Sequence, residues 1–243
     1  EEAKTLRVFL KSLSTERVQP QFQRSLSDEE LAIQNGRTLV KRYNCNGCHV
    51  IEGQGGAIAA FYANETRTPP PLEVGMIHEG EKVQATWLYQ FLGRPTPLRP
   101  WLDVRMPTFG LSIEEATILT KYFAVMGKQQ IPYEYVSVGE PDPEMLKAGR
   151  LLMSKDYFDC FTCHQQGEKK PEGPPESWAP DLSLTKRRLR PIWIGKWLKD
   201  PQKIQPGTKM PSYYPDGPDD ILGGKEDRQI QAITEYLMRL GEN

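Results

Sequence analysis

The chain has 243 residues, 38% of them hydrophobic, and its 31 basic and 32 acidic residues leave a formal net charge of −1. This size suits one large domain or two small ones, and the balanced charge gives no reason to expect a nucleic-acid or an anionic-membrane partner. No stretch approaches the roughly twenty consecutive apolar residues that a membrane-spanning helix needs, and Glu1–Lys4 do not read as a signal peptide. The sequence therefore predicts a globular chain without a membrane span.

Residues 1–26 are predicted to hold an amphipathic helix and a linker. Glu1–Leu10 matches Glu114–Phe123 in residue type. The two segments are separated by 113 residues, and the same separation aligns Gly36 with Gly149 without a gap. The simple interpretation is an N-terminal extension, because amphipathic leading helices are common. The unbroken register favours another hypothesis, in which residues 1–26 are the tail of a preceding module of a longer protein.

The next predicted helix leads into the first motif of the chain. It begins after Ser27, because Ser27–Glu30 forms a capping box. Cys45–His49 then reads Cys-x-x-Cys-His, which is typical of c-type haem attachment. Two thiols one turn apart can add to the two vinyl groups of one haem, and the next side chain can then reach the iron. The two cysteines are therefore predicted to hold a haem and His49 to bind its iron.

Residues 135–243 repeat the order of residues 27–134. Asp142 precedes a proline and is predicted to start a helix, and Cys160–His164 is a second Cys-x-x-Cys-His motif. The corresponding landmarks of the two halves are Trp87 and Trp193, Phe91 and Trp197, Met106 and Met210, and closing amphipathic helices at about 112–126 and 226–240. The chain therefore reads as a tandem repeat of one helical module.

Every cysteine of the chain lies in one of the two motifs. These cysteines are Cys45, Cys48, Cys160 and Cys163. Three other interpretations compete with haem attachment. A zinc site is one alternative, but two cysteine pairs that lie so far apart in the sequence, each followed by a histidine, fit such a site poorly. A redox dithiol usually occurs in a βαβ unit, whereas the surroundings of these motifs look helical. Structural disulfides would leave the histidine after each cysteine pair unexplained. The paired motifs favour the haem.

The two modules resemble a known family. Each is similar to a class I cytochrome c domain, and the pair resembles the dihaem cytochromes c of bacterial respiratory chains, over residues 27–243. The second module is the more similar of the two to the family pattern, and the similarity lies in Trp197–Pro201 and Pro206–Pro211. The resemblance implies an all-α fold of two tandem helical domains, 27–134 and 135–243, each enclosing one covalent haem c.

The resemblance also implies the remaining contacts of each iron. The methionine of the Met-Pro pair supplies the sixth ligand in that family. The implied axial pairs are His49 with Met106 and His164 with Met210. The carbonyls of Pro70 and Pro180 are expected to accept the proton of the neighbouring proximal histidine. The aromatic residues Trp87, Phe91, Trp193 and Trp197 are expected to line the haem pockets or pack the helices.

His78 is the one histidine outside the two motifs. Its plain interpretation is a solvated or capping residue just before the helix that contains Trp87. The alternative is an iron ligand that replaces Met106, as a switchable first haem would require.

A haem held by two thioethers and two axial ligands suits outer-sphere electron transfer, so we expect an electron carrier and no catalytic residue. Its expected partners are redox proteins or subunits of a membrane respiratory complex. The main alternative is a dihaem enzyme such as a cytochrome c peroxidase, which needs one haem to open. A thiosulfate-oxidising cytochrome typically needs a cysteine as an iron ligand, and all four cysteines of this chain lie in the two attachment motifs. A haem-based sensor would need a five-coordinate iron. The resemblance implies a location in the periplasm or on the outer face of the inner membrane.

Overall fold

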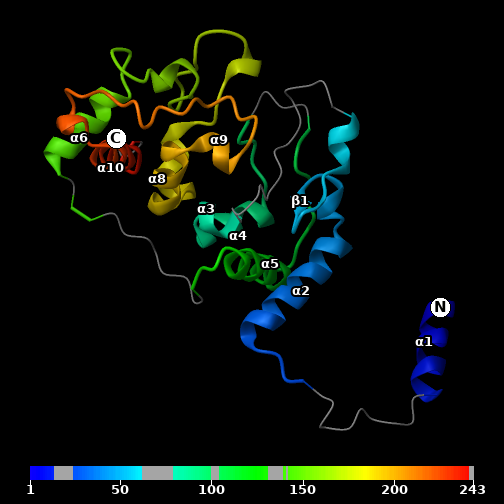
Figure 1. Cartoon of the computed structure of the whole chain (residues 1–243). Coiled ribbons are helices and arrows are strands. Elements are labelled where there is room, and N and C mark those ends of the chain that lie inside the picture. Colours follow the sequence, from blue (N-terminus) through cyan, green and yellow to red (C-terminus); the bar gives the residue numbers. More distant parts are fainter. Residues whose placement is uncertain (14–23, 62–78, 100–103, 131–138, 141, 241–243) are drawn as a thin grey trace.

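The computed structural model describes residues 1–13, 24–61, 79–99, 104–130, 139–140 and 142–240. Pro70 and His78 lie outside these residues. The predicted all-α fold is confirmed: the only paired strands among the described residues are β1 (Val50–Ile51) and β2 (Gln54–Gly55), which form a short antiparallel hairpin. Figure 1 shows the helices gathered into two groups that follow one another along the chain. No helix in the described part of the chain is long and apolar enough to cross a membrane.

Each group contains the helices that the repeat predicts. The first comprises α2 (Asp28–Arg42), η2 (Cys45–Gly47), η3 (Ala57–Phe61), α3 (Glu79–Lys82), α4 (Ala85–Gly93) and α5 (Ile113–Met126). The second comprises α6 (Pro143–Leu152), η4 (Cys160–Thr162), η5 (Pro175–Ser177), η6 (Leu182–Leu184), α7 (Thr185–Arg188), α8 (Pro191–Lys199), α9 (Pro201–Ile204), η7 (Leu222–Gly224) and α10 (Glu226–Leu237). The order α2, α4, α5 in the first module thus recurs as α6, α8, α10 in the second.

The predicted helix starts are confirmed. The Ser27 hydroxyl accepts from the backbone N–H of Glu30, and the Glu30 carboxylate accepts from the backbone N–H of Ser27. Asp142 Oδ1 accepts from the backbone N–H of Glu144 at 2.9 Å, with Pro143 in the first turn of α6. Each cap satisfies backbone donors that a helix N-terminus leaves without an intrahelical partner.

The first and last long helices of each module cross at a glycine. A Cβ on Gly36 of α2 would lie 2.2 Å from Cγ of Tyr122 in α5. A Cβ on Gly149 of α6 would lie 2.2 Å from the carbonyl oxygen of Ala232 in α10. No side chain fits at these distances, so the glycines that the repeat pairs in the sequence allow the same close crossing in both modules.

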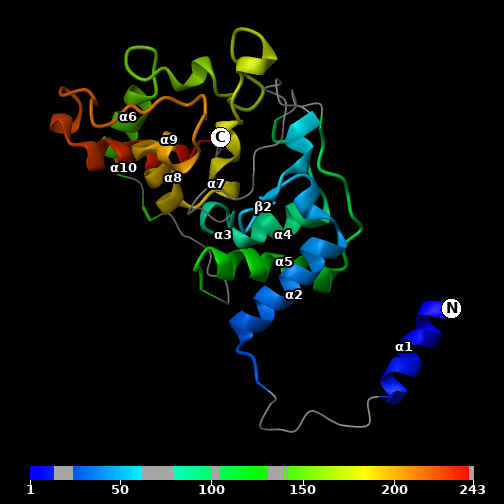
Figure 2. The same ribbon diagram turned by 45° about the vertical axis from the view of Figure 1, so that its right-hand side comes forward.

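Helix α1 (Glu2–Leu13) has no buried residue and stands away from both modules in Figures 1 and 2. Its large apolar side chains at Leu6, Phe9, Leu10 and Leu13 are more than half exposed. The counterparts of the first three in the repeat register, Leu119, Tyr122 and Phe123, are buried in α5. The apolar face of α1 therefore carries the pattern of a closing helix. Its interpretation as the tail of another module stays a prediction.

The two modules meet along the segments that precede Trp87 and Trp193. Val83 forms an antiparallel bridge with Leu189. The backbone N–H of Gln84 donates to the carbonyl of Arg188 at 2.8 Å. The backbone N–H of Arg190 donates to the carbonyl of Lys82 at 3.0 Å. Counted back from the two tryptophans, these residues occupy equivalent places in the repeat, so the junction has approximate two-fold symmetry.

Candidate haem-binding sites

Both Cys-x-x-Cys-His motifs fold into the same turn. The residue before each turn is left-handed, with φ of 51° at Asn44 and 46° at Asp159, a conformation that Asn and Asp tolerate better than most residues. The backbone N–H of His49 donates to the carbonyl of Cys45 at 2.9 Å, and that of His164 to Cys160 at 3.0 Å. Each motif therefore places two cysteines and one histidine on a single tight turn, as the predicted chemistry requires.

The first cysteine of each motif is partly buried, which disfavours its thiolate. None of the four cysteines forms a disulfide. Burial raises the pKa of Cys45, and burial together with the charge of neighbouring groups raises the pKa of Cys160 to about 12. A redox dithiol needs the opposite shift, because its nucleophile is the thiolate. In the described part of the chain no three His, Cys, Asp or Glu side chains converge as ligands of an ion such as zinc.

The ring of His164 is held in one orientation. Its Nδ1 lies 2.8 Å from the carbonyl oxygen of Pro180, and since a carbonyl only accepts, Nδ1 is the donor. The strand-like contact between His164 and Ala179, with the Ala179 N–H donating to Cys163 O at 2.7 Å, brings Pro180 into place. Burial lowers the pKa of His164. In the neutral ring Nε2 carries no proton and is available to bind a metal. The contact with Pro180 is the one that the resemblance implies.

Met210 lies against an aromatic pair of α8. The indole N–H of Trp197 donates to Sδ of Met210 at 2.8 Å. Trp197 in turn stacks on Trp193, with ring centroids 5.2 Å apart and planes 18° from parallel. A thioether sulfur has two lone pairs, so this contact leaves one for a metal. The sequence placed Trp197 in the haem pocket but did not reveal its contact with the sulfur.

The first module repeats the aromatic pair with one difference. Trp87 stacks on Phe91 with centroids 4.8 Å apart and planes 18° from parallel. Met106 is half-buried and packs against the core cluster that contains Trp87. Phe91 stands where the second module has Trp197, and a phenyl ring has no N–H to offer the sulfur. Pro70, the expected partner of His49, lies outside the described residues.

The donor set of each module fits a covalently bound haem. It consists of two thiols and an imidazole on one turn, a thioether on a distant loop and a stacked aromatic pair. In the second module the imidazole ring is also already fixed by Pro180. The structure does not contradict the ligand assignments, which remain predictions.

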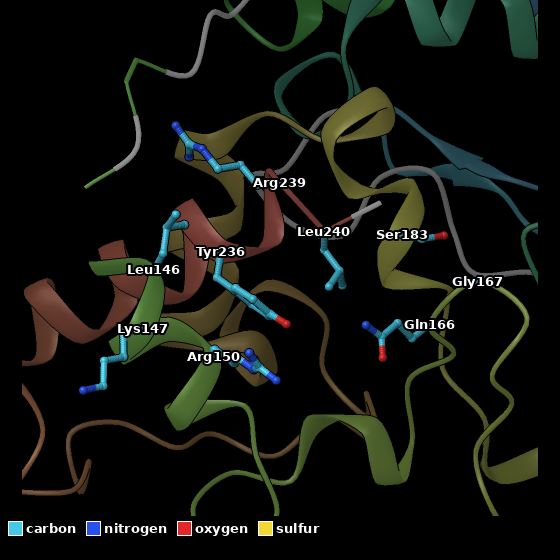
Figure 3. A pocket seen from close by; sticks show the side chains of 9 residues that line it. All are labelled: Leu146, Lys147, Arg150, Gln166, Gly167, Ser183, Tyr236, Arg239 and Leu240. Carbon is cyan, nitrogen blue, oxygen red and sulfur yellow. The ribbon is translucent and has the colours of Figure 1, made fainter. Parts of the chain in front are cut away.

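A surface pocket of about 680 Å³ lies elsewhere, beside α6 and α10 of the second module (Figure 3). Arg150, Tyr236 and Arg239 line part of it. Its lining contains no cysteine, histidine or methionine. The pocket therefore contains none of the predicted haem ligands, although Gln166 and Gly167 of its lining closely follow His164 in the sequence.

Comparison with known proteins gives matches of two kinds. The family model described as Cytochrome c matches residues 33–126 and 146–241, one match in each module. The protein named cytochrome c oxidase subunit 2 from Bacillus sp. (strain PS3) is 31% identical over 107 residues, which cover 41% of this chain and 27% of that protein. This chain thus spans about a quarter of the curated relative that it matches. No solved structure matches the chain.

Proposed function

This chain belongs to the cytochrome c family, and we propose that it carries two covalently bound haems, one in each module, and passes single electrons between redox partners. Haem-based electron transfer follows from the family. The number of haems rests on one observation, the identical turn that both Cys-x-x-Cys-His motifs form in the two matched segments. The haem, when bound, supplies an iron that cycles between the ferric and ferrous states.

The residues of the chain have separate tasks in this proposal. Two thioether bonds per module hold the haem, through Cys45 and Cys48 or through Cys160 and Cys163. His49 and Met106 would bind the iron in the first module, and His164 and Met210 would bind it in the second. Pro180 fixes the proton of His164 on Nδ1, which orients the ring and raises its basicity as a ligand. Two protein ligands per iron leave no position for a substrate, which favours electron transfer over catalysis.

We also propose a respiratory role for the chain. The likeness to a protein named cytochrome c oxidase subunit 2 supports a place as a subunit or domain of a membrane-associated respiratory complex. Covalent haem attachment takes place outside the bacterial cytoplasm, so the proposed location is the periplasm or the periplasmic face of the inner membrane. Helix α1, with its exposed apolar face, is proposed to be the closing helix of a further module.

Haem counting and carbon monoxide binding test the proposed function. The holoprotein is expected to contain two covalent haems per chain by pyridine haemochrome assay and mass spectrometry. Both should titrate as reversible one-electron centres, with near-infrared thioether bands for two methionine ligands. Rapid, stoichiometric binding of carbon monoxide to the reduced protein at neutral pH would instead indicate an open iron and favour the dihaem peroxidase.

A further inference from the structure

The two-fold junction places a cation of each module over a tryptophan of the other. Nζ of Lys82 in α3 lies 5.4 Å from the ring centroid of Trp193. Cζ of Arg188 in α7 lies 5.2 Å from the ring centroid of Trp87. Lys82 and Arg188 occupy equivalent places in the repeat, so the exchange is reciprocal. Figure 2 shows α7 next to α3 and α4 at this junction.

Among the residues that the structure describes, positive charge is in excess at the junction. Lys82, Arg99 and Arg188 share one nearby carboxylate, Glu79, whose Oε2 lies 3.7 Å from Nζ of Lys82. Arg188 and Glu79 are each only 8% exposed. Burial lowers the pKa of Lys82 to about 8 and that of Arg99 to about 10, because desolvation disfavours the charged forms. Further negative charge at the junction would stabilise the charged forms of these cations.

Two buried donors at the junction also need an acceptor. Nε of Arg188 and Nε1 of Trp193 have no hydrogen-bond partner among the described residues. Arg188 is 8% exposed and Trp193 is 6% exposed, so water does not readily reach either group. Leaving a buried N–H without a partner is energetically unfavourable. Both unmet groups are donors, so a ligand with acceptor oxygens would satisfy them, and the positive charge of Lys82 and Arg188 favours an anion among such ligands.

The group that each module is proposed to hold has such anions. A haem carries two propionate carboxylates, which match donors of the arginine and indole type. We propose that Lys82 and Arg188 form a shared site for haem propionates at the module junction, so that each module completes the haem site of the other. This inference rests on the proposed function, because it requires haems in both modules.

The contacts assign the cations to haems in a crossed manner. Arg188 belongs to the second module but lies over Trp87, whose ring stacks on Phe91 in the core that Met106 joins. It is therefore assigned to the first haem. Lys82 belongs to the first module but lies over Trp193, beside the Trp197 and Met210 contact. Lys82 is therefore assigned to the second haem.

Redox titration of the full-length holoprotein tests the crossed assignment. A nearby positive charge favours ferrous over ferric iron, so Arg188→Gln should lower the potential of the first-module haem. The ferrous-to-ferric ratio at a fixed potential should fall on the order of tenfold, the effect of one charge across about 10 Å of protein at an effective dielectric of about 20. Met106→His and Met210→His, which alter one haem spectrum each, identify which centre has moved.

Two matched variants make this test specific. Arg187→Gln removes the same charge from the preceding residue of α7, where the side chain is exposed, and should leave both potentials almost unchanged. Arg188→Lys keeps the charge and should restore most of the potential, which a merely structural role of the guanidinium would not predict. If Arg188→Gln does not fold, Lys82→Gln serves instead, with the shift expected at the second-module haem.

The results separate this inference from the proposed function. Two reversible one-electron haems whose potentials respond equally to Arg188→Gln and Arg187→Gln would refute the shared site and leave electron transfer intact. A shift of the second-module haem by Arg188→Gln would refute the crossed assignment. Potentials that depend on added phosphate at constant ionic strength would assign the site to a free anion. Absence of a second haem would overturn the proposed function itself.

Discussion

The two modules have the same fold around their proposed haems, but they differ at the second ring of the stacked aromatic pair. In the second module Trp197 donates its indole N–H to Sδ of Met210. In the first module the equivalent ring is Phe91, which stacks on Trp87 with the same 18° tilt that relates Trp197 to Trp193. Stacking is thus preserved while the hydrogen bond is not. One substitution in a repeated scaffold can make two otherwise similar iron sites unequal.

A second difference lies at the surface. Arg37 of α2 forms a forked ion pair with Glu52, at distances of 2.8–3.1 Å. Its counterpart Arg150 in α6 instead lines the pocket of Figure 3. The repeated arginine therefore serves a different purpose in each module. Equivalence in the repeat predicts the backbone position of a residue better than it predicts its partner.

The largest expected effect comes from removing one attachment motif. Cys160→Ala combined with Cys163→Ala should halve the covalent haem per chain, because each motif is proposed to hold its own haem. The pyridine haemochrome assay measures this directly, and the same pair of changes at Cys45 and Cys48 is the matched control. Loss of all haem from either double variant would contradict independent sites.

The glycine crossings should be the next most sensitive positions. Gly149→Ala forces a methyl group against the Ala232 carbonyl and should destabilise the second module by about 3 kcal/mol, the upper end of overpacking costs. Gly36→Ala should cost the first module somewhat less, about 2 kcal/mol, because it meets a side chain rather than backbone. Urea unfolding followed by circular dichroism and haem absorbance measures both.

Gly195→Ala is the matched control for these crossings. Its Cβ would meet only Cγ2 of Ile230 at an ordinary 3.5 Å. Alanine is the better helix former, so this variant should be neutral or gain up to about 1 kcal/mol. Equal destabilisation by Gly195→Ala and Gly149→Ala would show that the close crossing is not the cause.

A smaller effect is expected from exchanging the residues beside the methionines. A hydrogen bond withdraws electron density from the sulfur. The sulfur then becomes a weaker donor to the iron and stabilises the ferric state less. Trp197→Phe should therefore lower the potential of the second-module haem, and Phe91→Trp should raise that of the first. A bond worth about 1 kcal/mol corresponds to a roughly fivefold change in the ferrous-to-ferric ratio. Spectroelectrochemical titration measures both, and shifts of the same sign would contradict the mechanism.

The smallest effect should come from the surface ion pair. Glu52→Gln removes the partner of Arg37, whose side chain is 55% exposed, so the free energy of unfolding should fall by no more than about 0.5 kcal/mol. Arg150→Gln in the second module is expected to be neutral, because Arg150 forms no such pair with any residue that the structure describes. Urea unfolding at low and high salt checks both variants. A loss above 1 kcal/mol at Glu52 would show that the pair holds the hairpin in place.

Much of the fold was predictable because its signals are local. The capping box at Ser27 and the Asp142-Pro143 start depend on a few adjacent residues, and both are observed. The haem motifs are equally local, since five residues place two thiols and a histidine on one turn. The methionines were predictable only through the family resemblance, because a thioether in a loop has no distinctive spacing of its own.

By itself, the sequence determined the helical repeat, the two attachment turns and the paired glycines, all of which follow from short-range spacing and backbone sterics. Only the tertiary structure decided which side chains meet across the repeat. The bridge between Val83 and Leu189, and the placement of Arg188 over Trp87, join residues about a hundred positions apart. Such contacts depend on how two folded surfaces fit together, and no local pattern encodes them.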